Sequence, residues 1–570
     1  MRTVTLRQRP LPDLELEWPA SMHPALCRIY LARGIRDPDQ IQHVLDRLAP
    51  PQLLSGMDGA AALLARAIAA DQRIVIAGDY DCDGATGMAV AVRGLRMLGA
   101  KQVDYVVPNR FEHGYGLSPA LVSTLRQSPD VLVTVDNGIA SLAGVDAARA
   151  RGIKVVITDH HLPGPTLPNA DAIVNPNLDG DPFPSKSLAG VGVMFYLLAA
   201  VRSRLCETGQ MDQARQPRLS ALLDLVALGT VADMVALDYN NRVLVEQGLK
   251  RIRSGRACAG IVALAEASGR SLDTLTASDM GFALGPRLNA AGRLEDMTLG
   301  VECLLTDDSA RARELAERLS SINAERRHLQ ASMVAEAERM VAGADVPDSL
   351  GVVLHDADWH PGVIGLVASR LKDRLHRPVV AFAPSEAGSD SLRGSARSIH
   401  GFHIRDALAE VDAKYPGLMG PFGGHAMAAG LSLPKAQLQR FSTVFEAVVR
   451  QRMQPELLES VLWTDGGLEE GQLDIALARV LRLAGPWGQA FPEPLFDNVF
   501  QCLQRRPMGS NHLRLRLRDP RDGAHIDAVM FNVDMDLPEM PMLRAAYSLT
   551  VNDWQDRETA RLLLRHIEPA

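Results

Sequence analysis

Runs of apolar and β-branched residues lie at 74–78, 103–107, 131–135 and 154–158, and carboxylate and imidazole side chains follow the first, third and fourth of them. Runs of this kind are typical of buried parallel strands, and the carboxyl ends of such strands meet at one edge of a sheet. A single Asp after a strand is most often a helix cap. Seven acidic or imidazole groups at three strand ends are harder to explain that way, because crowded carboxylates repel one another unless cations neutralise them. The seven are Asp79, Asp81, Asp83, Asp136, Asp159, His160 and His161.

This mixture of ligand types predicts a site for divalent cations. Carboxylates and imidazoles suit ions such as Mn²⁺ better than they suit soft, thiolate-bound metals. The number of groups is sufficient for two ions, and two ions about 3.5 to 4 Å apart favour in-line displacement at phosphorus. The residues alone therefore predict a metal-dependent hydrolase of phosphoesters or phosphoanhydrides.

Helical stretches at 86–99, 118–127 and 141–151 separate the apolar runs. Strands that alternate with helices predict an α/β fold with a doubly wound parallel sheet. Its carboxyl edge would hold the acidic and imidazole groups in one crevice.

The rest of the chain predicts further domains. The stretch 306–343 has apolar residues at helical spacing, and a second α/β pattern restarts at 351. From about 451 the alternation typical of half-buried strands suggests a small β-barrel, in which Leu513, Leu515 and Leu517 face inward. The alternating arginines at 514, 516 and 518 then form either a solvated face or a nucleic-acid face.

The composition narrows the functional classes. The chain has 570 residues, 47% of them hydrophobic, and a net charge of −8, which excludes histone-like binding of nucleic acid through a global positive field. Its longest uncharged stretch, 187–201, falls short of the roughly 18 residues that a membrane span needs. We find neither a secretory signal nor paired cysteines among the six, so we expect a cytoplasmic protein with reduced thiols.

Four short motifs carry a resemblance to a known family. GDYDCDGATG (78–87), TVDNG (134–138), TDHH (158–161) and GTVADM (229–234) resemble the metal motifs of the DHH phosphoesterase superfamily. The fuller match resembles the RecJ single-strand-specific 5′ to 3′ exonucleases and covers nearly the whole chain. It includes VPNRFEHGYGL (107–117), GPRLNAAGR (285–293), WHPGVIGLVASRL (359–371), GSARS (394–398) and GGHAMAAG (423–430).

The resemblance implies a domain order. We expect an N-terminal segment packing on the catalytic domain, a DHH catalytic domain, a long connecting helix, a DHHA1-like α/β domain that binds substrate, and a C-terminal OB-like barrel that binds nucleic acid. The catalytic and DHHA1-like domains would face each other across a groove. The expected bounds are 1–55, 56–305, 306–345, 346–450 and 451–570.

The resemblance also implies roles at the metal site. Two ions, Mn²⁺ or Mg²⁺, would be held by a set of ligands in which Asp136 is the bridge, and Asp79 would support or join that set. His161 would contact the scissile phosphate, and Asp159 would orient the loop. The catalytic residues would thus be Asp136, His161 and Asp79. Related pyrophosphatases have a histidine where this chain has Ala77. The implied ligands are Asp79, Asp81, Asp83, Asp136, His160 and Asp233.

Contacts to DNA are implied in other motifs. Arginines and a serine match positions that resemble a pocket for a 5′-terminal phosphate, which the planar guanidinium suits. The glycines of GGHAMAAG would let the backbone approach a phosphate, although a tight turn would also use them. Arg293 and Arg370 could instead pair with acidic residues. The implied DNA-binding residues are Arg110, Arg287, Arg370, Ser395, Arg397, Gly423, Gly424 and His425.

Taken together, the resemblance implies a metal-dependent exonuclease that degrades single-stranded DNA from its 5′ end to 5′-mononucleotides, in DNA repair and recombination. Single-strand DNA-binding protein and a recombination helicase are possible partners, and we expect a monomer. Two alternatives remain: a phosphodiesterase of very short RNA or cyclic dinucleotides, and a replication scaffold that has lost its metals. The barrel and GPRLNAAGR disfavour the first, and the retained acidic residues disfavour the second.

Overall fold

The computed structural model divides the chain into two compact units. One consists of Gln8–Ser321 with Thr464–Ala570, and the other of Met1–Arg7 with Ile322–Trp463. The structure describes residues 4–109, 113–114, 116–343, 349–386, 388–509, 511–533, 538–554 and 557–570.

A five-stranded parallel sheet organises the first unit, with strand order β3-β2-β4-β5-β6. Successive residues of one strand point to opposite faces, so that Ile74 and Ile76 enter one hydrophobic core while Val75 and Ala77 enter another. Both faces are covered by helices, which explains why the strands are apolar throughout. The strands are β2 (Ile74–Ala77), β3 (Val103–Val106), β4 (Val131–Val135), β5 (Lys154–Thr158) and β6 (Ala172–Val174).

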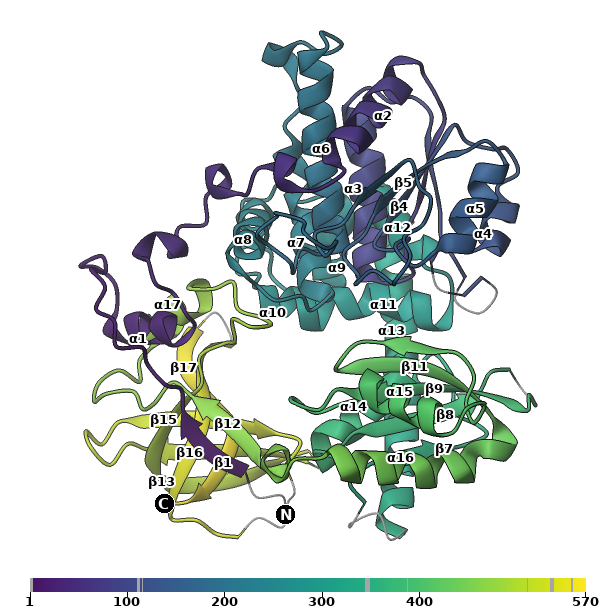
Figure 1. The fold of residues 1–570 in the computed structure, drawn as a ribbon. Helices are drawn as coiled ribbons and strands as arrows, with labels where there is room; N and C mark the ends of the chain where they lie inside the picture. Colours follow the sequence, from purple (N-terminus) through teal and green to yellow (C-terminus); the bar gives the residue numbers. More distant parts are fainter. Residues whose placement is uncertain are drawn as a thin grey trace. The chain divides into compact units, whose positions relative to one another are not determined.

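Helices α4 (Pro119–Thr124) and α5 (Leu142–Ala150) cover one face of this sheet, and α2 (Met57–Ala69), α3 (Cys82–Met97) and α6 (Gly190–Glu207) pack on the other (Figure 1). The doubly wound arrangement expected from the sequence is confirmed. The remaining helices of this part are α7 (Leu223–Ala232), α8 (Tyr239–Arg253), α9 (Ala259–Ala267), α10 (Ala277–Asp279), α11 (Gly285–Leu294) and α12 (Thr298–Leu305), with a π-helical turn at Met280–Leu284 between α10 and α11.

The long helix α13 (Ser309–Gly343) has 35 residues. Asp308 caps its start, because the Asp308 carboxylate accepts a hydrogen bond from the Ala310 amide at 2.8 Å. Leu315 and Leu319 are buried in the core of the first unit, as their helical spacing predicts.

A mixed sheet of order β10-β11-β9-β8-β7 forms the second unit. Only β7 and β8 pair in parallel, and the other neighbours are antiparallel. Phe382, Phe441 and Phe445 lie at the centre of its core. The elements are β7 (Val352–His355), α14 (Ile364–Leu375), β8 (Val379–Pro384), β9 (Ser391–Arg397), α15 (Ile404–Lys414), β10 (Phe422–Gly424), β11 (Ala428–Pro434) and α16 (Leu438–Arg452).

The C-terminal strands close into a five-stranded barrel of order β13-β14-β15-β17-β16. Leu513, Leu515 and Leu517 point into the barrel, whereas the arginines between them are exposed, which confirms the alternation expected from the sequence. Helix α17 (Ile475–Leu483) packs beside this barrel. The strands are β13 (Phe496–Met508), β14 (His512–Arg518), β15 (His525–Phe531), β16 (Met542–Trp554) and β17 (Arg557–Pro569).

The N-terminal segment contacts more than one part of the chain. Strand β1 (Val4–Gln8) pairs with β12 (Ser460–Thr464), and α1 (Pro24–Ala32) leads into Arg33, which binds Asp465. Farther along, Ala49 and Ser55 hydrogen-bond to Asn240 and Asp181 of the catalytic part. The segment therefore joins the region before the barrel to the catalytic helices. Among the residues that the structure describes, no helix has the length and apolarity needed to cross a membrane.

Candidate metal centre

The loop after β2 brings three carboxylates to the carboxyl edge of the parallel sheet. Asp79 is buried just beyond the strand. Asp81 caps α3 by accepting the Gly84 amide at 3.0 Å. Asp83, in the first turn of α3, is 1% exposed, and its two carboxylate oxygens accept the amides of Gly190 and Val191, at 2.7 and 2.9 Å. The start of α6 therefore orients Asp83 toward the site.

Asp136 follows β4 in a left-handed backbone conformation, with φ of 63°. Only small polar residues and glycine adopt this region at modest cost, and such strain occurs often at functional sites. Helix α6 approaches this residue closely: a Cβ atom on Gly190 would lie 2.5 Å from the Asp136 Cβ. Glycine at position 190 is therefore required by the packing of α6 against the Asp136 backbone.

The loop after β5 contributes a pair of histidines held by Asp159. The Asp159 carboxylate accepts the amides of Ile139, His160 and His161 and lies 2.7 Å from the His161 Nδ1. Burial alone would raise the pKa of Asp159, but these hydrogen bonds, led by that from His161, lower it. The Asp159 carboxylate thus orients the loop that carries the two histidines.

The His160 ring points into the centre, where its Nε2 lies 3.0 Å from Asp136 Oδ1 and 3.6 Å from Asp233 Oδ2. Asp233 reaches the site from the C-terminal end of α7. Ligand-capable atoms of seven residues fall into three overlapping groups of three, and within each group these atoms lie within 4.8 Å of one another. The groups are Asp136, His160 and His161; Asp83, His160 and Asp233; and Asp79, Asp81 and Asp136.

The electrostatics of the centre fit a cation. Burial, followed by the charge of Asp233, raises the pKa of Asp83 to about 7, and burial and Asp81 raise the pKa of Asp233 to about 7. The pKa of Asp136 is raised well above its ordinary value by burial and by Asp83. Negative charge is therefore held in a buried place where only bound cations, or protons, can balance it.

His161 is distinct from His160 in its electrostatics. Burial alone would lower the pKa of His161, but the hydrogen bond to Asp159 raises it to about 9. Burial and the neighbouring His161 lower the pKa of His160. A protonated His161 suits a phosphate oxygen, whereas a neutral His160 suits a metal ion.

Several residues that support the centre were missed in the sequence. Asn175 and Asn177 donate hydrogen bonds to the backbone carbonyls of His161 and His160, at 2.9 and 2.5 Å. Asn289 of α11 accepts the Cys82 amide at the start of α3 at 2.7 Å. Asn289 lies in GPRLNAAGR, and that motif was the only signal that could have pointed to it.

The residues proposed for DNA binding in the second unit gather at one end of its sheet. The Arg397 guanidinium donates to Ser395 Oγ at 2.9 Å, and both side chains lie against Gly365 of α14. Gly423 and Gly424 lie on β10, which pairs with β11, the neighbour of the strand that carries Ser395. His425 follows them on the surface, and its amide donates to the Ala428 carbonyl at 2.7 Å.

Other proposed DNA-binding arginines are placed differently. Arg370 is exposed on α14. Arg287 of α11 donates to Ser320 Oγ at 2.9 Å and to the Ala283 carbonyl at 2.6 Å, which ties it to the π-helical turn. Arg110 lies outside the described residues.

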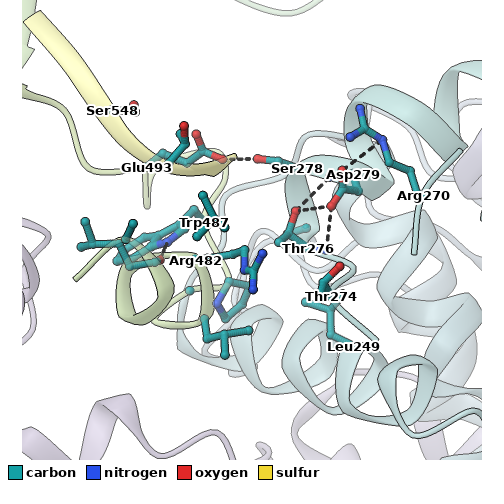
Figure 2. Close-up of a pocket in the computed structure, with 18 of the residues that line it drawn as sticks. Leu249, Arg270, Thr274, Thr276, Ser278, Asp279, Arg482, Trp487, Glu493 and Ser548 are labelled. Carbon is teal, nitrogen blue, oxygen red and sulfur yellow. Dashed lines mark hydrogen bonds and ion pairs between the residues drawn. The ribbon is translucent and has the colours of Figure 1, made fainter. Parts of the chain in front are cut away.

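A separate cavity of about 500 Å³ lies between α8 and α10 on one side and α17 and β16 on the other (Figure 2). Its arginines face carboxylates: Arg270 lies 3.3 Å from Asp279, and Arg482 lies 3.5 Å from Glu558. Ser278 and Glu493 bridge its two sides. Because its charges are internally matched, we assign this cavity no ligand.

Comparison with known proteins places the fold and the centre in a class. Family models described as "DHH family, N-terminal domain", "DHHA1 domain" and "RecJ OB domain" match residues 73–230, 348–451 and 464–566. The parallel sheet with its acidic and histidine centre is therefore that of a DHH-family protein, extended by a DHHA1 domain and an OB barrel.

Relatives that match nearly the whole chain define a narrower family within this class. The chain is 49% identical to the single-stranded-DNA-specific exonuclease RecJ of Dickeya dadantii, over 100% of both chains, and 46% identical to that of Escherichia coli, over 99% of both. A crystal structure of RecJ in complex with Mn²⁺ from Thermus thermophilus matches with a TM-score of 0.80 and 32% identity, over 96% of this chain and 76% of that one. The chain belongs to the RecJ family.

Proposed function

We propose that this chain is a metal-dependent exonuclease that degrades single-stranded DNA from the 5′ end, releases 5′-mononucleotides and acts in DNA repair and recombination. One observation carries the proposal. Carboxylates and His160 from three strand ends and from α7 converge, so that their ligand-capable atoms form groups of three within 4.8 Å of one another. The relatives at high identity are named single-stranded-DNA-specific exonucleases, and RecJ from Thermus thermophilus has been crystallised with Mn²⁺ and with Mg²⁺.

Two Mn²⁺ or Mg²⁺ ions would be held by five carboxylates of the centre and by His160. When bound, such ions neutralise charge on the phosphodiester and make water a stronger nucleophile. Asp83 can still offer lone pairs, because each of its oxygens accepts only one amide. The proposed ligand set is Asp79, Asp81, Asp83, Asp136, His160 and Asp233.

His161 is proposed to bind the scissile phosphate. The Asp159 carboxylate lies 2.7 Å from the His161 Nδ1 and raises the pKa of His161 to about 9, and a protonated imidazole suits a phosphate oxygen. Asn175 and Asn177 fix the backbone of this loop, so that the two rings keep separate roles.

Contacts to the DNA, including the 5′-terminal phosphate, are proposed for the polar residues of β9 and β10 and, separately, for arginines elsewhere in the chain. Arg397 and Ser395 are already hydrogen-bonded to each other, and a guanidinium beside a hydroxyl is well suited to phosphate oxygens. The full proposed set is Arg110, Arg287, Arg370, Ser395, Arg397, Gly423, Gly424 and His425. Single-strand DNA-binding protein and a recombination helicase as partners, a monomeric state and a cytoplasmic location remain proposals, the last supported by six free thiols.

The test is degradation of 5′-labelled single-stranded DNA with Mn²⁺, beside a matched duplex, a dinucleotide and the Asp136→Ala variant. We expect labelled mononucleotide to appear first and from the single strand only, and the variant to be inactive. Mn²⁺ should also raise the melting temperature of the native chain, and much less that of Asp136→Ala. Cleavage of the dinucleotide alone would favour a small-substrate phosphodiesterase, and absence of all metal-dependent cleavage would favour a scaffold.

A further inference from the structure

Helix α11 packs closely on the loop after β2, which carries three of the proposed metal ligands. A Cβ atom on Gly292 of α11 would overlap the backbone oxygen of Tyr80 in this loop, so only glycine allows the approach. About one turn earlier on the same helix, the Asn289 Oδ1 accepts a hydrogen bond from the Cys82 amide at 2.7 Å. The loop is therefore held by its backbone, at one point through a side chain and at another through the absence of one.

The same helical segment also packs on the end of α7, which carries Asp233. In the π-helical turn before α11, a Cβ atom on Gly281 would lie 3.4 Å from the Val231 Cγ1. Gly285, the first residue of α11, approaches the same helix end, and a Cβ atom there would lie 3.0 Å from the Ala232 Cβ. The π-helical turn and α11 thus connect two segments that are far apart in the sequence and that both carry proposed ligands.

The hydrogen bond to Asn289 satisfies a donor that α3 itself cannot satisfy. Cys82 is the first residue of α3, and the first four amides of a helix have no acceptor within the helix. Asp81, the residue before it, accepts the Gly84 amide. Cys82 is only 1% exposed, so water cannot easily replace a lost acceptor, and a buried amide without one is costly. Asn289 therefore acts as a cap for α3 that is supplied by another helix.

Asp81 has two tasks at the start of α3. Its Oδ1 caps the helix, and a ligand-capable atom of its carboxylate lies within 4.8 Å of those of Asp79 and Asp136. Without Asn289, the Cys82 amide would need another acceptor, and the acidic side chains of its own loop are the proposed metal ligands. A carboxylate oxygen that accepts an additional amide has fewer lone pairs for a cation. The acceptor on α11 therefore leaves the carboxylates of the loop available for metal.

We propose that Asn289 is a positioning residue of the metal centre: by accepting the Cys82 amide, it holds the loop after β2 in the conformation in which Asp81 and Asp83 bind metal. This inference rests on the function proposed above and extends it to a residue outside the proposed ligand set. Asn289 acts through the backbone of the loop and not through a contact with the metal. Because the loop is held before the ions arrive, little of their binding free energy is lost in ordering it.

The test is Mn²⁺ binding to the full chain, measured by titration calorimetry on the native protein, Asn289→Ala and Asn289→Asp. Asn289→Ala removes the acceptor, and loss of a group that orients metal ligands typically lowers metal affinity about 10- to 100-fold. We expect a fall of about ten-fold or more in this variant. Asn289→Asp keeps an acceptor oxygen of the same reach, so its affinity should stay within about three-fold of the native value or exceed it.

Hydrogen exchange in the metal-free chain separates the hydrogen bond from the charge of the new aspartate. The Cys82 amide should exchange about five-fold or more faster in Asn289→Ala and at the native rate in Asn289→Asp. Cleavage of single-stranded DNA by Asn289→Ala should be lost at low Mn²⁺ and recover at high Mn²⁺, with an unchanged KM for DNA. A general loss of folding would not be reversed by metal in this way.

Asn498→Ala is the matched control. The Asn498 Oδ1 accepts the Leu468 amide at 3.0 Å, a hydrogen bond of the same kind at the barrel. This variant should have a lower melting temperature and native Mn²⁺ affinity. Native Mn²⁺ affinity in Asn289→Ala would overturn the proposal, and so would an equal loss of affinity in Asn289→Asp or in Asn498→Ala. If Asn289→Ala does not fold, Asn289→Ser, whose hydroxyl is one bond shorter than the amide oxygen, replaces it with the same expected outcomes.

Failure of this inference is distinguishable from failure of the proposed function. If the native chain binds Mn²⁺ and cleaves single-stranded DNA, and Asp136→Ala does not cleave it, the function stands whatever Asn289→Ala does. If the native chain neither binds Mn²⁺ nor cleaves single-stranded DNA, both proposals are overturned.

Discussion

Gly190 and Asp136 meet backbone to backbone where α6 begins beside the metal centre. Gly190 also donates its amide to Asp83 at 2.7 Å, so one glycine touches two of the proposed ligands. The Asp136 φ of 63° leaves that residue little freedom to move away. The placement of the carboxylates thus depends on a residue that has no side chain.

We expect Gly190→Ala to displace Asp136, because the new methyl group would lie 2.5 Å from its Cβ and 2.7 Å from its Cα. Misplacement of a reacting group by about 1 Å can cost roughly a hundredfold in rate. The measurement is Mn²⁺ binding by calorimetry together with single-turnover cleavage.

The matched control for this substitution is Gly192→Ala on the same helix. A methyl group there would meet the side chain of Leu188, which can shift, rather than a metal-site backbone. Equal losses in both variants would show that general repacking of α6, and not the position of Asp136, is responsible.

At the scale of elements, the segment that precedes the catalytic core is docked on α8. Tyr239 donates its hydroxyl to the Gln42 carbonyl at 2.9 Å, and Gln247 donates to the His43 carbonyl at 2.5 Å. The His43 ring is buried under this contact, beside Tyr239. Burial, together with the charges of Arg242 and Lys250, lowers the pKa of His43 to about 4.

This depressed pKa predicts loss of stability in mild acid. The unfolded state takes up a proton at His43 below about pH 6.5, whereas the folded state does so only near pH 4. The free energy of unfolding is therefore highest above pH 6.5 and decreases as the pH falls from 6.5 to 4. At pH 5 the loss is about 2 kcal/mol relative to pH 7. Thermal unfolding of the native protein and of His43→Gln at pH 5 and pH 7 measures this loss of stability. The same pH dependence in both proteins would refute the assignment to His43.

At the scale of the whole chain, a buried ion pair joins sequence positions that are far apart. Arg33 donates to both carboxylate oxygens of Asp465, at 2.7 and 2.9 Å, and their side chains are 1% and 0% exposed. Arg33 also lies over the ring of Trp487, at 5.4 Å from the centroid. Removing either charge alone leaves the other buried without full compensation.

We therefore expect Asp465→Asn to destabilise the chain by about 3 to 5 kcal/mol. The double variant Arg33→Met/Asp465→Asn should lose less free energy of unfolding than the two single variants lose together, because neither charge is then left buried without its partner. Denaturant unfolding of the native chain, the single variants Arg33→Met and Asp465→Asn, and the double variant measures the coupling. The exposed pair Arg7 and Glu459, with side chains 52% and 58% exposed, is the control, and its removal should change stability by less than about 1 kcal/mol.

Much of the fold was predictable from local patterns in the sequence. The parallel strands β2, β4 and β5 were recognised because apolar residues run along them, and the outward arginines of β14 because residues alternate with a period of two. The acidic and histidine groups were recognised because each follows a strand directly. Strand β6, by contrast, has only three residues at the end of the sheet, too few to show a period.

The sequence by itself determined the chemistry of the metal centre, since the types of its ligands and their places after strands are local properties of the chain. Only the tertiary structure decided which oxygen faces which donor. The hydrogen bond from the Gly190 amide to Asp83 joins residues 107 apart in sequence. The hydrogen bonds from Arg514 and Arg516 to Asp527 depend on the register of β14 and β15. Such contacts arise from packing between distant segments, and no pattern of neighbouring residues encodes them.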